Sequence, residues 1–162
     1  MTATDVRRRL AGVAAVTGMV DLAVKAAASR WLTVPVELPG LTLRVTHNTG
    51  IAFGLGADQP FALVATATGL VVAVLVAAAW RGHLGGPAPA GLVVGGGVAN
   101  VADRFVGGSV IDVFDLGWWP VFNLADVAII SGFVLLLITS IQRTESADHQ
   151  RPRTPDSLGD QS

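Results

Sequence analysis

The 162-residue chain contains no cysteine and no tyrosine. Without cysteine, disulfide bridges, thiolate metal sites and a cysteine nucleophile are excluded, so any chemistry has to come from Asp, Glu, Lys, His, Ser or Thr. Charged residues are also scarce, at 14% of the chain, whereas soluble domains average about 25%. The net charge is −1, so there is no basic field to attract nucleic acid, and we expect no nucleic-acid partner.

Apolar residues make up 51% of the chain, and they gather in four long stretches. Each stretch is close to the roughly 20 residues that a helix needs to cross a bilayer. The stretches cover about residues 10–31, 61–80, 88–105 and 121–141. A bilayer core offers no water to satisfy the backbone, so these segments are expected to be helical. The sequence therefore predicts an all-α membrane protein with four transmembrane helices.

Two longer loops and a polar tail connect and follow these stretches. The first loop, residues 32–60, alternates apolar and polar residues over Leu41–Thr46 and is interrupted by Pro39 and Gly40. That pattern predicts a small extracytoplasmic β element in this loop. Residues 106–120 are expected to form the second loop. The tail, residues 144–162, is polar and contains two prolines, so we expect it to be disordered.

The positive charges predict the orientation in the membrane. Seven arginines fall before the first stretch, between the second and third, and after the fourth: Arg7, Arg8, Arg9, Arg81, Arg143, Arg151 and Arg153. An excess of Lys and Arg marks cytoplasmic loops, so both termini are expected to be cytoplasmic. The start of the chain also resembles a secretory signal peptide. Asp21 and Lys25 interrupt its apolar run and three further stretches follow, which favours a membrane helix.

Polar residues inside the apolar stretches are the candidates for chemistry. Asp21 and Lys25 are spaced i, i+4 on one helix face, and charges at such depth normally face the bundle interior. We favour a structural ion pair for them over a direct catalytic role. Asn48 and Gly50 suit a turn at the end of the first loop.

The third stretch carries Asn100, Asp103 and Arg104 on one face, at i, i+3 and i+4. Asp103 and Arg104 form either a simple interfacial pair or part of a site. Gly91 and Gly95, with Ala99, form a ladder of small residues that allows close approach of another helix.

Asp112 and Asp126 lie in the region richest in acids and amides. Asp112 has apolar neighbours on both sides, and such a context raises the pKa of an unpaired carboxyl. If Asn123 is the N-cap of the fourth helix, Asp126 is at its N3 position, where the helix dipole favours the anion. Two carboxyls in different environments suit acid/base work. From these arguments alone, an ordinary loop acid and an ordinary capping acid remain equally acceptable.

Five motifs in this order resemble a known family. They are Asp21-x-x-x-Lys25, Asn48-x-Gly50-x-Ala52-Phe53, Gly95-Gly96 with Asn100-x-x-Asp103-Arg104, Val110-Ile111-Asp112, and Phe122-Asn123-Leu124-Ala125-Asp126. The set is similar to the lipoprotein signal peptidases, also called signal peptidase II, over roughly residues 19–140. Each motif is weak alone, but the ordered set at the outer ends of four stretches is specific.

The resemblance implies an aspartic endopeptidase of the bacterial cytoplasmic membrane. Residues 1–143 would form a four-helix transmembrane peptidase domain, with residues 144–162 as a cytoplasmic tail. The catalytic pair would be Asp112 and Asp126. The supporting or substrate-binding residues would be Asp21, Lys25, Asn48, Gly50, Asn100, Arg104 and Asn123. The substrate would be a prolipoprotein, cleaved on the amino side of a diacylglyceryl-modified cysteine, with membrane lipids as further partners and with no metal or cofactor.

The sequence departs from the family pattern at two positions. Ala99 stands where a glycine usually precedes the asparagine of the third helix, and Val113 stands where an aromatic usually follows the first catalytic aspartate, with Phe114 one place later. Two other classes of function stay open. A small transporter would also bury acids but should show inverted repeats, of which we find none, and an assembly subunit would not need two acids in its outer segments.

The predicted topology is testable with fused reporters. A reporter placed after Arg81 or Arg143 is expected to read as cytoplasmic, and one inserted near Pro39 or Gly117 as external, because the positive charges retain their loops in the cytoplasm. Alkaline phosphatase and green fluorescent protein activities measure the two locations. The opposite reading at any of these four points contradicts the four-span arrangement.

Overall fold

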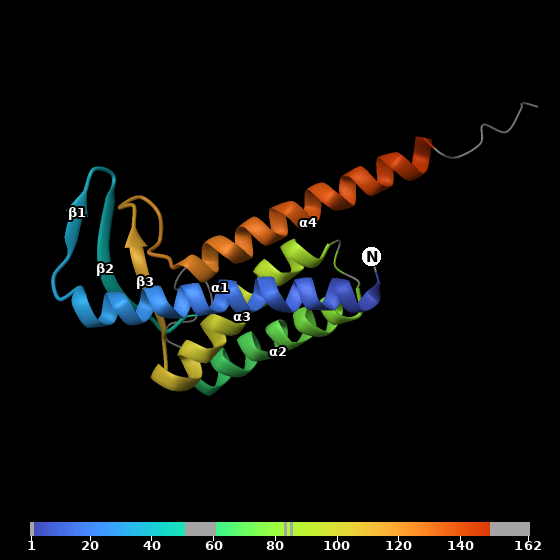
Figure 1. The fold of residues 1–162 in the computed structure, drawn as a ribbon. Coiled ribbons are helices and arrows are strands. Elements are labelled where there is room, and N and C mark those ends of the chain that lie inside the picture. Colours follow the sequence, from blue (N-terminus) through green and yellow to red (C-terminus); the bar gives the residue numbers. More distant parts are fainter. Residues whose placement is uncertain (1, 51–60, 83, 85, 150–162) are drawn as a thin grey trace, which may run out of the picture.

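The computed structural model describes residues 2–50, 61–82, 84 and 86–149. In chain order the elements are α1 (Ala3–Trp31), β1 (Val36–Leu38), β2 (Leu41–Asn48), α2 (Phe61–Trp80), α3 (Pro87–Gly107), β3 (Val110–Asp115) and α4 (Leu124–His149). Figure 1 shows the three strands gathered at one end of the helices, beside the C-terminal end of α1 and the N-terminal end of α4. The fold is therefore mostly helical, with one small sheet.

The helices lie where the sequence predicts them, but several ends differ. α1 begins at Ala3 rather than near residue 10, because Thr2 and Asp5 form a capping box that extends it. α4 begins at Leu124 rather than near residue 121, and it continues to His149. Residues 144–149, whose polar composition predicts a disordered tail, are thus helical. The rest of the tail, 150–162, lies outside the described residues.

Two of the described helices are long and apolar enough to cross a membrane. They are α1 over Ala3–Trp31 and α4 over Leu124–Gln142, and α2 adds a shorter apolar stretch over Thr66–Trp80. Only 17% and 11% of the most apolar windows of α1 and α4 are buried, whereas the core helix of a soluble protein would be mostly buried. Their apolar side chains face outward, as lipid-facing side chains do.

α3 is the central helix, and its glycines explain how the others approach it. It packs against α1, α4 and α2. A Cβ atom on Gly91 or Gly95 would collide with α1, and one on Gly96 would collide with the backbone of Ala125 in α4. The predicted small-residue ladder thus serves the contact with α1, while Gly96 serves α4. This packing brings the polar end of α3 between α1 and the start of α4.

The sheet draws its strands from both predicted loops. Its order is β1-β2-β3, and both pairings are antiparallel. β1 and β2 form a hairpin in which Gly40 has a φ of 76° after Pro39, as in a type II turn. The predicted β element covered the first loop only, and residues 106–120 were expected to be a loop. That expectation was wrong for Val110–Asp115, which pair with β2 as a third strand.

Close packing at Gly96 is testable by a single methyl group. Gly96→Ala is expected to lower the unfolding free energy by about 1–3 kcal/mol, because the new Cβ would lie 2.5 Å from the Ala125 carbonyl oxygen. The matched control is Gly12→Ala in α1, where nothing lies within 4 Å of the added Cβ. Thermal unfolding in detergent measures both variants. Equal stability of the two would contradict tight α3–α4 packing at this glycine.

Candidate active site

Asp112 is a buried acid in the third strand. Its side chain is 2% exposed, and β3 buries Val110 and Val113 close to it. The Asp112 carboxyl accepts hydrogen bonds from Asn48 Nδ2 at 3.1 Å and from Asn123 Nδ2 at 2.6 Å. Burial is the main cause that raises the pKa of Asp112 from 3.8 to about 6, and the negative charge of the nearby Asp126 adds to the rise. The two amide donors and Lys25 act in the opposite direction, because they stabilise the ionised form of Asp112. A neutral form of Asp112 is thus accessible near neutral pH.

Asp126 is part of the N-terminal cap of α4. The Asn123 side-chain oxygen accepts from the Asp126 backbone N–H at 2.9 Å, and the Asp126 carboxyl accepts from the Asn123 N–H at 3.2 Å. This reciprocal arrangement is a capping box, so the predicted N-cap and N3 positions are confirmed. The other carboxyl oxygen accepts from Asn100 Nδ2 at 2.9 Å.

Asn123 is the residue that joins the two acids. Its side-chain N–H donates to Asp112, and its side-chain oxygen caps α4 at Asp126. Both polar atoms of the amide are used, and the residue is 1% exposed. The two carboxyls, 14 positions apart in the sequence, are therefore held at one point between β3 and α4 by a single rigid amide.

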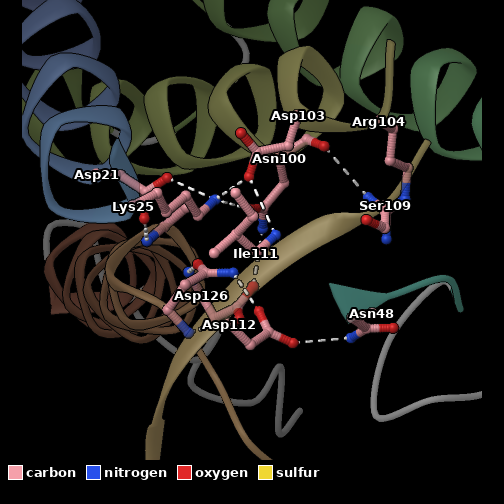
Figure 2. Close-up of polar contacts among 12 residues, drawn as sticks. Asp21, Lys25, Asn48, Asn100, Asp103, Arg104, Ser109, Ile111, Asp112 and Asp126 are labelled. Carbon is pink, nitrogen blue, oxygen red and sulfur yellow. Dashed lines mark hydrogen bonds and ion pairs between the residues drawn. The ribbon is translucent and has the colours of Figure 1, made fainter. Parts of the chain in front are cut away.

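Lys25 lies behind the two acids with its ammonium fully enclosed. The residue is 2% exposed, and its Nζ atom is 2.7 Å from Asp21, 2.7 Å from Asp103 and 2.8 Å from Asn100. Figure 2 shows this cluster between α1 and α3, next to the start of α4. Because Asn100 also donates to Asp126, the ammonium is one side chain away from that acid.

Both carboxylates that hold Lys25 also accept a backbone hydrogen bond. Asp21 accepts from the N–H of Ala125 at 2.8 Å, and Asp103 accepts from the N–H of Ile111 at 3.3 Å. Ala125 and Ile111 are the residues immediately before Asp126 and Asp112. The buried ion cluster therefore reaches the backbone on which each of the two acids stands.

The end of β2 positions Asn48 against Asp112. The Asn48 side-chain oxygen accepts from the Gly50 N–H at 2.9 Å, which is the predicted turn, and its amide nitrogen donates to Asp112. Arg104 secures this turn from α3, since its Nη2 atom donates to the Gly50 carbonyl at 2.6 Å. Ala52 and Phe53, which complete the motif, lie outside the described residues.

A cavity of about 700 Å³ opens onto the two acids. Most of its wall is apolar and comes from α2, α3, α4 and the segment between β3 and α4. Apart from Thr68, its polar lining residues are Asn48, Asn100, Arg104, Asp112 and Asp126. An apolar cavity with two carboxyls at one end suits an apolar or lipid-bearing substrate whose reactive group is presented to the acids.

Comparison with known proteins identifies the family of this chain. A family model described as signal peptidase (SPase) II matches residues 13–142. The chain belongs to the signal peptidase II family. A lipoprotein signal peptidase of Mycolicibacterium smegmatis is 37% identical over 148 residues, which are 83% of this chain and 61% of that protein. That of Syntrophomonas wolfei is 47% identical over 102 residues, 61% of this chain and 67% of the relative.

A further relative and two solved structures extend the comparison. The lipoprotein signal peptidase of Mycobacterium tuberculosis strain H37Rv is 36% identical over 150 residues, 83% of this chain and 71% of that protein. A bacterial membrane enzyme solved at 2.3 Å has a TM-score of 0.71 at 22% identity and covers 89% of this chain and 92% of its own. A second, solved at 1.9 Å, has a TM-score of 0.61 at 24% identity and covers 80% and 89%. Both share the fold.

The structure connects all nine residues that the sequence places in a signal peptidase II site. Hydrogen bonds and one ion pair link them in the order Asp21, Lys25, Asn100, Asp126, Asn123, Asp112, Asn48, Gly50 and Arg104. Asp115 stands apart from this chain of contacts. It binds the Gly117 N–H at 2.7 Å and Arg44 at 2.7 Å, and these contacts lower its pKa.

Asp103 is the residue whose role the sequence did not identify. The sequence offered Arg104 as its ion-pair partner, whereas the structure pairs Asp103 with Lys25 and aims Arg104 at the Gly50 carbonyl. The i, i+3 spacing of Asn100 and Asp103 placed them on one helix face. The spacing alone could not indicate which other helix this face contacts.

The two departures from the family pattern are accommodated by packing. Ala99 is 1% exposed, so its methyl group fits between the helices. The Phe114 ring lies 5.6 Å from that of Phe122, which supplies an aromatic contact one residue after the usual place.

The pKa of Asp112 predicts a specific pH dependence of stability. Its folded pKa, about 6, is above the ordinary 3.8, so the folded state binds the proton more tightly. Protonation of Asp112 therefore stabilises the folded state by about 3 kcal/mol below pH 3.8. This contribution is lost as the pH rises through 6. We expect thermal unfolding temperatures to fall less between pH 4 and 7 in Asp112→Asn than in the wild type. Asp115→Asn serves as the control, and an unchanged pH dependence in Asp112→Asn would refute a raised pKa.

Proposed function

We propose that this chain is an aspartic endopeptidase that removes signal peptides from prolipoproteins, with Asp112 and Asp126 as its catalytic pair. The observation that carries the proposal is the position of Asn123, which is hydrogen-bonded to both carboxyls at the polar end of an apolar cavity. The membership of the signal peptidase II family supplies the reaction class.

The different surroundings of the two acids support different roles. Asp112, with its raised pKa, is the acid that donates a hydrogen bond to the scissile carbonyl oxygen. Asp126, at the N-terminus of α4, is the carboxylate that takes a proton from the attacking water. Water adds to the carbonyl carbon, the C–N bond breaks, and the proton passes to the leaving amine. The pH comparison of Asp112→Asn above tests the first assignment, since an ordinary pKa would remove its basis.

The shape of the cavity supports a lipid-modified substrate. Its walls come mainly from apolar side chains of the helices, and α2 and α4 expose further apolar residues outside it, among them Leu70, Val74 and Leu137. Acyl chains of a diacylglyceryl-cysteine would remain among apolar groups while the peptide bond on its amino side reaches the acids. Burial of apolar chains in such a cavity contributes roughly 0.8 kcal/mol per CH₂ group.

The arrangement of charges supports an outer-face site in the bacterial cytoplasmic membrane. The Arg7 guanidinium lies 5.2 Å from the Trp80 ring centroid, so the N-terminal arginines and the α2–α3 link, which carries Arg81, share one end of the helices. The catalytic pair lies at the other end, beside the sheet (Figure 1). With the positive end cytoplasmic, four passes place both termini inside and the acids outside.

Asparagine substitutions test the catalytic pair directly. Asp112→Asn and Asp126→Asn are each expected to reduce cleavage of a diacylglyceryl-modified prolipoprotein by at least about a thousandfold, because each removes a proton donor or acceptor used in the reaction. Cleavage is followed with purified protein in detergent, and thermal unfolding verifies that the variants are folded.

Asp115→Asn is the matched control for both substitutions. It lies on the same strand as Asp112, but it binds Arg44 and Gly117 and not the catalytic pair, so near-normal cleavage is expected. Substantial turnover by Asp112→Asn or Asp126→Asn would rule out the two-aspartate mechanism, whatever the control shows.

A further inference from the structure

Asp103 makes two contacts with a single oxygen atom. Its Oδ2 is 2.7 Å from Lys25 Nζ and accepts the Ile111 N–H at 3.3 Å. The side chain is 10% exposed, and it comes from α3, whereas its partners come from α1 and β3. One oxygen thus connects three elements immediately beside Asp112.

The contact with Ile111 lies on the edge of β3 that, within the described part of the chain, pairs with no other strand. β2 pairs with the other edge of β3, in a sheet whose order ends at β3. Along the uncovered edge, the Ile111 N–H is bound by Asp103 and the Val113 N–H is bound by the Phe122 carbonyl at 2.9 Å. The two residues that flank Asp112 are therefore both fixed through their own N–H groups, which donate to acceptors on this edge.

These anchors determine where the Asp112 carboxyl stands. Successive side chains of a strand point to opposite faces, so a backbone shift at Ile111 turns or displaces the side chain of Asp112. Asp112 accepts from Asn123 at 2.6 Å, a distance that leaves little freedom for such a shift. A displacement of about 1 Å from productive geometry reduces turnover by roughly a hundredfold.

We propose that Asp103 is a positioning residue for Asp112, whose Oδ2 atom holds the β3 backbone at Ile111 against the buried ammonium of Lys25. The proposal rests on the proposed function in so far as Asp112 is catalytic there. It differs from a purely electrostatic role, in which Asp103 would only balance the charge of Lys25. With a purely electrostatic role, loss of the Asp103 charge would lower kcat even if an oxygen atom remained at the same position.

Two substitutions separate these roles. Asp103→Asn keeps an oxygen that can take both contacts and removes the charge, while Asp103→Ala removes both. We expect kcat to fall about a hundredfold in Asp103→Ala at a KM within about twofold of wild type, and to stay within about fivefold of wild type in Asp103→Asn. Both variants should lose thermal stability, because both delete a carboxylate beside a buried cation.

Hydrogen exchange at the Ile111 amide tests the anchor without substrate. Loss of a hydrogen bond that contributes about 1 kcal/mol speeds exchange by roughly five- to tenfold. We expect this acceleration in Asp103→Ala and not in Asp103→Asn, with Asp115→Asn as the control on the same strand. If Asp103→Ala does not fold, the Asp103→Asn variant alone tests the proposal. An Ile111 amide that stays protected from exchange, together with a near-normal kcat, supports it.

Three results would overturn the proposal. The first is a kcat that is as low in Asp103→Asn as in Asp103→Ala, and the second is a loss of kcat/KM that comes from a raised KM. The third is hydrogen exchange at the Ile111 amide that is fast in Asp103→Asn or unaffected in Asp103→Ala. Failure of the wild-type protein to cleave a diacylglyceryl-modified prolipoprotein is a different outcome, because it would refute the proposed function. The exchange measurement would still decide whether Asp103 anchors the strand.

Discussion

The buried ammonium of Lys25 is the interaction on which the rest of the site depends. A lone charge 2% exposed would be costly, by several kcal/mol even after relaxation. Asp21, Asp103 and Asn100 surround it at 2.7–2.8 Å, so its charge is satisfied only when α1 and α3 are correctly aligned. Asp21 and Asp103 also accept from the backbone N–H just before each candidate catalytic acid. An ion cluster that would merely stabilise two helices therefore also fixes where β3 and α4 begin.

The glycines of α3 make that cluster geometrically possible. Gly91 and Gly95 let α1 approach closely, and Gly96 does the same for α4. With larger residues, the helices would stand farther apart than the reach of Lys25 and Asn100 allows. In a lipid environment, where apolar side chains gain little from leaving the solvent, such close contact and internal hydrogen bonding are the main sources of helix association. In this member of the signal peptidase II family, the helix packing and the polar network thus support each other.

Much of the fold and of the candidate site could be predicted from the sequence. Apolar length located the four helices of the described residues, although it put the start of α4 near residue 121. The capping pattern Asn123-x-x-Asp126 gave that start correctly because its two partners are only three residues apart. The third strand was missed, since Val110–Asp115 pairs with residues more than 60 positions earlier. For Asp103 the sequence offered Arg104 as one possible partner and left a place in the site open, because local spacing alone cannot reveal a partner on another helix, here Lys25.

The sequence by itself determined the local features: where the apolar helices lie, where α4 is capped, and which residue types are available for chemistry. These depend on neighbours within about four positions, which a sequence displays directly. Only the tertiary structure decided that nine scattered residues, eight of them polar, form one chain of contacts, that Asn123 joins Asp112 to Asp126, and that Asp112 is buried enough to raise its pKa to about 6. Such features arise from the desolvation and hydrogen bonding of groups brought together by helix packing, and no local pattern encodes them.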